Sequence, residues 1–220
     1  MNALQLAQLL QLTDSFFPVG AFAYSDGLES AAANGKLRDG ASLKIWIEHY
    51  LNNVFVPCDG LAFLQCTEAF QRHDMERIRA IDEELTAIRP ASAVRDSSRM
   101  IGKRLMATYS GISGMTGVEL PHCNAPAAYA IALTHRGIDV RTGTIAFGYG
   151  RMSGMISASL RLIAVGQQEA HGILSHSLEQ LPAAVDQIFE LRTEPLRCFT
   201  PMMDIAQMNH QHMYSRLFRS

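Results

Sequence analysis

The sequence predicts an all-α protein, a single-domain bundle of about nine or ten helices. Apolar residues recur at helical spacing through most of the 220 residues, as in amphipathic helices with one buried side. Only two short runs, TGTIAF and LRLIAV, have the composition of strands, and both lie among helical segments. The chain can bury a core without disulfide or metal staples, and it contains no repeat, low-complexity segment or obvious linker. We therefore expect one domain over residues 1–220.

Two apolar stripes define the clearest helices of the first half. The first stripe consists of Leu43, Trp46, Ile47, Tyr50, Leu51 and Val54. We expect Pro57 to end this helix, because proline lacks a backbone N–H and clashes with the preceding helical turn. The second stripe runs from Met75 to Ile88, stops before Pro90 and lies opposite a charged face. It predicts a surface helix with one buried side.

The glycine-rich stretch that follows predicts a buried central helix. Gly150, Gly154 and Ala158 are spaced four apart, so they share one helical face. Small residues at this spacing allow two helices to approach closely. We expect this face, together with Arg161, to pack against another helix or to form the seam of a dimer.

Prolines also divide the C-terminal third. Because proline is tolerated in a first helical turn but not inside a helix, Pro182 predicts two helices, over residues 167–180 and 182–192. A final short helix should begin with Asp204 as its N-cap. That helix would carry Ile205, Met208 and His212 on one side, and the chain then ends in an aromatic and arginine-rich tail.

Composition excludes several classes of function. A net charge of −2 and a pI near 6.4 argue against a nucleic-acid partner, which needs a surplus of Lys and Arg. The longest uncharged run, from Leu120 to His135, is broken by two prolines, so we expect no membrane span. The start carries no basic leader and the four cysteines are scattered, which favours reduced thiols and the cytoplasm. Hydrophobic residues at 48%, charged residues at 18% and 11 methionines fit a surface covered by partner proteins.

Catalytic motifs are not found. The Gly-Lys pairs at Gly35 and Gly102 lack the Ser or Thr of a P-loop, so we expect no NTPase and no enzyme. The alternative is an all-α metal-binding protein or enzyme whose site is formed by His122, His171, His176 and Glu179. His210 and His212 could share a soft metal if the tail were extended. An arginine that stimulates a partner GTPase also stays open, although no spacing selects which one.

Two segments are more specific to one protein family than any motif above. They are LLQLTDSFFPVGAFAYSDGLES at residues 9–30 and DIAQMNHQHMYSRLFRS at 204–220. Together they resemble the family of urease accessory proteins UreF. Between them, SSRMIGKRLM, HCNAPAAYAIAL and GRMSGMISASLRLIAVGQ are similar to middle segments of that family, in the same order. The resemblance implies a non-catalytic, dimerising nickel-insertion chaperone. It would join the D/H-type accessory protein, recruit the nickel-carrying GTPase and act on apo-urease through that complex, with no cofactor of its own.

The resemblance assigns the tail at about 204–220 to the D/H-type partner. Aromatic and arginine side chains commonly carry interface energy, so five tail residues are the candidates: Tyr214, Arg216, Leu217, Phe218 and Arg219. The tail could instead fold back onto its own core.

A second set of candidates lies near the N-terminus. We expect Tyr24, Asp26 and Glu29 to be exposed, where they could contact the GTPase or line a route for nickel, since carboxylates attract cations. Glu29 could equally cap a helix or pair locally.

Overall fold

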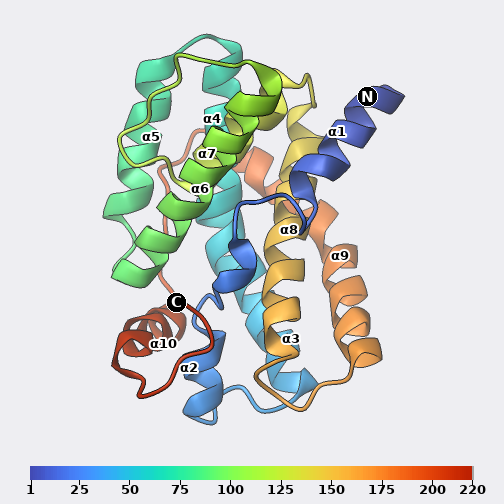
Figure 1. Ribbon diagram of the computed structural model, residues 1–220, viewed down its shortest axis with the longest axis vertical. Helices are drawn as coiled ribbons and strands as arrows, with labels where there is room; N and C mark the ends of the chain where they lie inside the picture. The colour runs from blue at the N-terminus through green and yellow to red at the C-terminus, as the bar shows by residue number, and fades with distance from the viewer. Residues whose placement is uncertain (220) are drawn as a thin grey trace.

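The computed structural model describes residues 1–219; Ser220, the last residue of the expected tail, lies outside the described residues. The helices are α1 (Ala3–Thr13), η1 (Ala21–Ala23), α2 (Leu28–Ala33), α3 (Gly40–Tyr50), η2 (Leu51–Asp59), α4 (Gly60–Gln71), α5 (Met75–Ala87), α6 (Ser92–Ser113), α7 (Ala125–His135), α8 (Val140–Ser159), α9 (Gln167–Glu190), α10 (Pro201–Asn209) and η3 (His210–His212). Figure 1 shows them as one bundle, and no strand occurs within residues 1–219. The predicted all-α, single-domain fold is confirmed.

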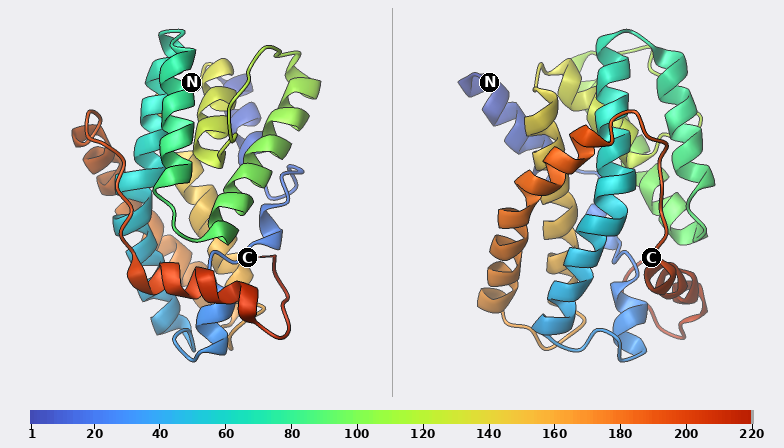
Figure 2. Two further views of the ribbon diagram at one scale, coloured as in Figure 1. Left: turned by 90° about the vertical axis from the view of Figure 1, so that its left-hand side faces the viewer. Right: turned by 180° about the vertical axis from the view of Figure 1, so that it is seen from behind.

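The expected helix end at Pro57 is wrong. α3, η2 and α4 follow one another without a break, as a long rod at the centre of the rear view in Figure 2. Pro57 lies inside η2, which is a π-helical stretch. A proline inside an α-helix clashes with the carbonyl four residues earlier, here that of Asn53. The wider π-helical turn gives this carbonyl room, so the helix continues.

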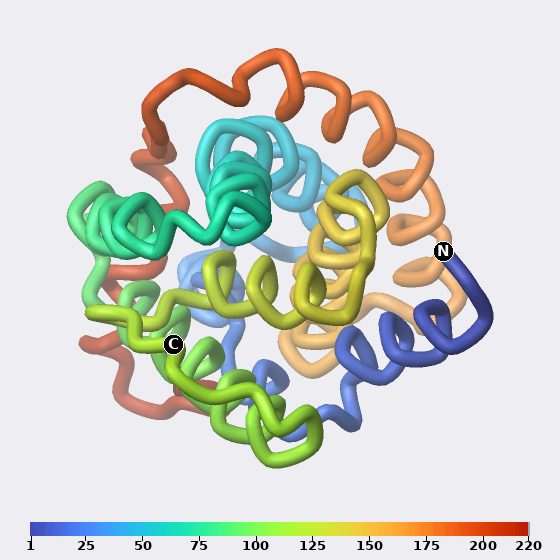
Figure 3. The backbone as a smooth tube through the Cα atoms, turned by 90° about the horizontal axis from the view of Figure 1, so that it is seen from above, coloured from blue at the N-terminus to red at the C-terminus, as the bar shows by residue number. Residues whose placement is uncertain are grey.

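The core is centred on α4 and α7 rather than on the glycine-rich helix. α7 packs against α4 on one side and α6 on the other, and Figure 3 shows it crossing the middle of the bundle. Most residues of α4 and α7 are buried. At the contact between α4 and α8, the ring of Phe63 stacks on that of Phe147 with centroids 5.4 Å apart. α4 and α7 therefore form the interior of the bundle, which the other helices cover.

α8 approaches its neighbours through glycines other than the expected ones. A Cβ at Gly148 would lie 2.8 Å from the Phe55 ring and 2.9 Å from Leu181, so only glycine fits there. In contrast, no atom lies within 4 Å of a Cβ built at Gly150 or Gly154. The prediction that Gly150 and Gly154 pack within the fold is wrong, and the face of α8 is open at these two positions, whereas Ala158, the third residue at this spacing, is buried.

The predicted break at Pro182 is also wrong, because α9 is one helix from Gln167 to Glu190. Its buried residues continue at helical spacing across the proline: Ala170, Ile173, Ser177, Leu181, Ala184, Val185 and Ile188. A proline inside a helix costs about 3 kcal/mol, which burial of this continuous stripe offsets.

A buried carboxylate fixes the loop between α6 and α7. Asp82 of α5 is fully buried and accepts hydrogen bonds from the backbone N–H groups of His122, Cys123 and Asn124, at 2.7, 2.8 and 2.7 Å. The Asn124 side chain also donates to it, at 2.8 Å. This loop therefore has a single anchored path onto the N-terminus of α7.

Among the described residues, none of the helices combines the length and apolar character needed to cross a lipid bilayer.

Candidate partner-binding site

The C-terminal segment forms a surface of its own at the lower left of Figure 1, beside α2 and under α5 and α6. α10 begins at Pro201 with Thr200 at the N-cap position, so the expected N-cap, Asp204, is wrong by four residues. Asp204 instead lies in the first turn, where its carboxylate accepts a hydrogen bond from the Thr200 hydroxyl at 3.3 Å. Negative charge in this turn stabilises the helix N-terminus.

α10 buries one side and exposes the other. The spacing of Met203, Ala206 and His210 places these residues on the buried face. The exposed large apolar residues of this region, which we call the C-terminal patch, are between 39% and 107% exposed: Phe199, Met202, Ile205, Met208, Tyr214 and Leu217. Apolar side chains gathered in this way mark a surface that a partner covers.

The tail turns back from η3 and is fastened by Glu29. This buried carboxylate of α2 lies 2.8 Å from Nε2 of His210 and accepts the backbone N–H groups of Leu217 at 2.5 Å and Phe218 at 3.2 Å. The backbone N–H of Arg219 donates to the carbonyl of Ala23 at 2.8 Å. One side chain therefore holds both the end of α10 and the last turn of the tail, and the left view of Figure 2 shows this loop.

Arg161 also contacts the tail. Its guanidinium lies 4.2 Å from the centroid of the Phe218 ring and donates to the carbonyl of Phe22 at 3.1 Å. Phe218 is buried, whereas Tyr214 and Leu217, which precede it in the chain, are exposed. The tail thus folds back through Phe218 and still presents two apolar side chains. Sequence reasoning missed Arg161 and His210 as tail contacts; only the spacing of His210 from Met203 and Ala206 signals its burial.

The expected exposure of Tyr24, Asp26 and Glu29 is wrong, since all three are buried. Asp26 forms an ion pair with Arg151 of α8, with Oδ2 and Nη2 2.9 Å apart. The backbone at Asp26 and Gly27 is left-handed, with φ of 52° and 87°, and this turn directs the side chains inward. Glu29 pairs with the tail, whose residues are distant in sequence, so the alternative that it caps a helix or pairs locally is wrong as well.

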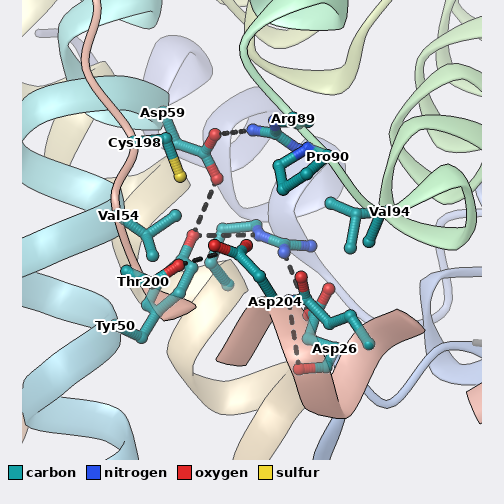
Figure 4. A pocket seen from close by; sticks show the side chains of 13 residues that line it. Asp26, Tyr50, Val54, Asp59, Arg89, Pro90, Val94, Cys198, Thr200 and Asp204 are labelled. Carbon is teal, nitrogen blue, oxygen red and sulfur yellow. Dashed lines mark hydrogen bonds and ion pairs between the residues drawn. The ribbon is translucent and has the colours of Figure 1, made fainter. Parts of the chain in front are cut away.

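A chain of buried polar groups fixes the same turn, as Figure 4 shows. From Asp26 it passes through Arg151 to the Tyr50 hydroxyl at 3.2 Å, then to Asp59 at 3.0 Å, and ends at Arg89, which is ion-paired with Asp59. Burial, and then the Asp59 charge, raise the pKa of Tyr50 well above its ordinary value, so its hydroxyl keeps its proton. Each of these five side chains has a partner, and together they join the helices and loops from which they come.

A groove lies between the N-terminal segment and the open face of α8. We call it the α8 groove; its volume is about 620 Å³, and it is lined by Phe22 and Tyr24 on one side and by Tyr149, Gly150 and Gly154 on the other. Phe22 is exposed and Tyr149 is partly so. Apolar lining and small residues give this groove the shape to receive a protein segment.

The proposed histidine and glutamate cluster is not brought together. His176 of α9 lies 3.2 Å from Glu48 and 2.8 Å from Gln180, while His171 and Glu179 are exposed. The backbone N–H of His122 donates to Asp82, in the loop before α7. Within residues 1–219, no three His, Cys, Asp or Glu side chains are arranged to hold a metal ion.

His210 and His212 do not form a pair either. His210 is buried against Glu29, whereas His212 is exposed and contacts the side chain of Gln211.

Comparison with known proteins gives one consistent answer. The UreF family model matches residues 37–178. Proteins named "Urease accessory protein UreF" are similar over nearly the whole chain: that of Methylibium petroleiphilum is 29% identical over all of this chain and 95% of its own length. Those of Trichormus variabilis and Microcystis aeruginosa are both 30% identical, over 96% and 98% of this chain and 94% and 98% of theirs. The chain therefore belongs to the UreF family of urease accessory proteins.

Proposed function

We propose that this chain is a non-catalytic scaffold in the complex that matures the urease nickel centre. It bridges the D/H-type accessory protein and the nickel-carrying GTPase, acts as a homodimer in the cytoplasm, and reaches apo-urease only through that complex. Nickel is cargo of the assembly, and the chain needs no cofactor of its own. The family membership and the two apolar surfaces support this role.

The observation that carries the proposal is the C-terminal patch. Buried apolar anchors near the centre of an interface contribute most of the binding free energy. Tyr214 and Leu217 have the shape of such anchors because they extend from a fastened tail, so little ordering entropy is lost when a partner binds. Arg216 and Arg219 are exposed beside them and would form a polar rim. We therefore assign this surface to the D/H-type protein, with the buried Phe218 side chain holding the tail in place beneath it.

Capture of the D/H-type protein by the tagged full chain tests this assignment. Replacing both Tyr214 and Leu217 with Ala should weaken capture at least 100-fold, because each hot-spot side chain contributes about 2 kcal/mol. Ile45→Ala is the matched control, since Ile45 of α3 is equally exposed and lies outside the patch. Truncation after His212 should abolish capture and leave the dimer intact. Undiminished capture by the double variant would contradict the assignment.

The α8 groove supports the second half of the proposal. Tyr24 and Asp26 line its wall, so we propose that they act in GTPase recruitment from within the groove and not from an exposed surface. Glu29 acts from inside as well, by holding the tail. The open face of Gly150 and Gly154 borders the same groove, and we propose it as the dimer seam.

A further inference from the structure

The segment that leads from α9 into α10 is fastened along the long central rod. The side chain of Gln65 donates to the carbonyls of Arg192 and Glu194 at 3.1 and 2.9 Å. Further on, the backbone N–H of Arg197 donates to the carbonyl of Pro57 at 2.9 Å. These bonds hold residues 191–198 against η2 and α4, and they set Cys198 beside Cys58.

The bond between Arg197 and Pro57 brings the next residues of the two segments, Cys198 and Cys58, next to each other, and the two thiols affect each other's pKa. Cys58 is fully buried, while Cys198 is partly exposed and lines a cavity of about 30 Å³ together with Asp59, Arg89 and Asp204. Figure 4 shows the Cys198 sulfur at the wall of this cavity, next to Asp59. The cavity is large enough for a molecule of the size of water. A small oxidant can thus reach Cys198, whereas Cys58 is buried and can react only with Cys198.

The surroundings make the two thiols unequal. The hydrogen bond with Cys58, helped by the charge of Arg89, lowers the pKa of Cys198 below its ordinary value in spite of partial burial. The same hydrogen bond, and then burial, raise the pKa of Cys58. Burial raises the pKa of the other two cysteines as well, that of Cys123 to about 12. Cys198 therefore has the most thiolate character of the four.

We propose that Cys58 and Cys198 are a reversible redox site that forms a disulfide with a hydroperoxide as oxidant. The Cys198 thiolate attacks one oxygen of hydrogen peroxide, the O–O bond breaks and the sulfur becomes a sulfenic acid. The departing hydroxide takes up the proton that the thiol had released and leaves as water. The Cys58 thiol then attacks the sulfenic sulfur, the S–S bond forms, and a second water leaves. Two thiols thus give two electrons to one peroxide, and a dithiol reductant reverses the change.

The disulfide would tie the entrance of α10 to η2. Cys198 lies only three residues before Pro201, where α10 begins, and Cys58 lies in the rod. Oxidation would thus fix the position of the C-terminal patch relative to the core. This inference concerns the chain alone and does not depend on any role in urease maturation.

Peptide mapping of the full-length chain under native conditions tests the site. After reduction and removal of the reductant, a few equivalents of hydrogen peroxide should remove two of the four free thiols and yield one peptide pair that joins Cys58 to Cys198. Dithiothreitol should restore all four. Cys198→Ser should slow thiol loss at least tenfold, whereas Cys123→Ser, the matched control, should leave the Cys58–Cys198 pair forming at the wild-type rate.

Three results would overturn the proposal. They are four thiols that persist, a pairing that involves Cys66 or Cys123, and a rate that Cys198→Ser leaves unchanged. Far-ultraviolet circular dichroism before and after oxidation ensures that the folded chain is the species that reacts. Because Cys198 is partly exposed, its serine variant keeps the packing of the core.

Discussion

Removing the Glu29 carboxylate should release the tail while the bundle stays folded. Glu29 is the one side chain that contacts His210 and the backbone of both Leu217 and Phe218 among the residues the structure describes. In Glu29→Ala, those donors would be left buried without an acceptor if the tail stayed closed. The tail can avoid this by opening into solvent, which the core helices cannot do.

The size of the effect follows from these contacts. A hydrogen bond to a charged group contributes about 1.5–3 kcal/mol, and three contacts of the Glu29 carboxylate hold the tail. Because the released donors regain water, we expect a net loss of about 3 kcal/mol in the free energy of tail closure. Since each 1.4 kcal/mol changes an equilibrium constant tenfold, the ratio of closed to open tail should fall roughly 100-fold.

Amide hydrogen exchange measures this ratio directly. The backbone amides of Leu217, Phe218 and Arg219 should lose protection by roughly 100-fold in Glu29→Ala. Glu29→Gln keeps one acceptor oxygen without the charge, so it should lose roughly tenfold. Glu83→Ala, which removes an exposed glutamate of α5, should change nothing.

Two results would refute this reasoning. Unchanged protection at residues 217–219 in Glu29→Ala would mean that Phe218 and Arg161 alone hold the tail. An equal loss of protection in α4 would mean that Glu29 supports the whole fold and not the tail.

Two further variants test other parts of the account. Light scattering of the complex with the D/H-type protein should show that Gly154→Leu converts the dimer to a monomer. Gly172→Leu, which is equally free of nearby atoms, should leave the dimer intact, and neither variant should lower Tm. An unchanged mass for Gly154→Leu would exclude the α8 face as the dimer seam. Asp82→Ala leaves three buried backbone N–H groups without an acceptor, which costs about 4 kcal/mol and should lower Tm by about 10 °C. The exposed control Asp96→Ala should stay within about 2 °C of the wild type, and an Asp82 variant as stable as the control would contradict the anchoring role.

Periodicity was sufficient for the fold class but not for where helices end. The apolar stripes correctly predicted the helices around Leu43 and Met75, because one-sided burial leaves its mark on sequence. At Pro57 and Pro182, the local preference of proline for a helix end was overridden by burial of the residues on both sides. A local rule cannot weigh that packing, which involves helices distant in sequence.

At the candidate site, too, local sequence patterns predicted some features, while others depend on residues distant in sequence. The exposure of Tyr214 and Leu217 follows from their place in a terminal tail, but the burial of Phe218 depends on Arg161 and Glu29, which are distant in sequence. Likewise, the spacing of Gly150 and Gly154 indicates a shared face and not whether a neighbour covers it. Contacts over such separations can be read only in three dimensions.

We propose that this chain connects the D/H-type protein to the GTPase. Size-exclusion chromatography with light scattering of the D/H-type protein and the GTPase, with and without this chain, tests it most directly. We predict one complex that contains all three proteins when the full chain is present, and separate peaks for the two partners when it is absent or lacks residues 213–220. Association of the two partners without this chain, or their separation in its presence, would contradict the account.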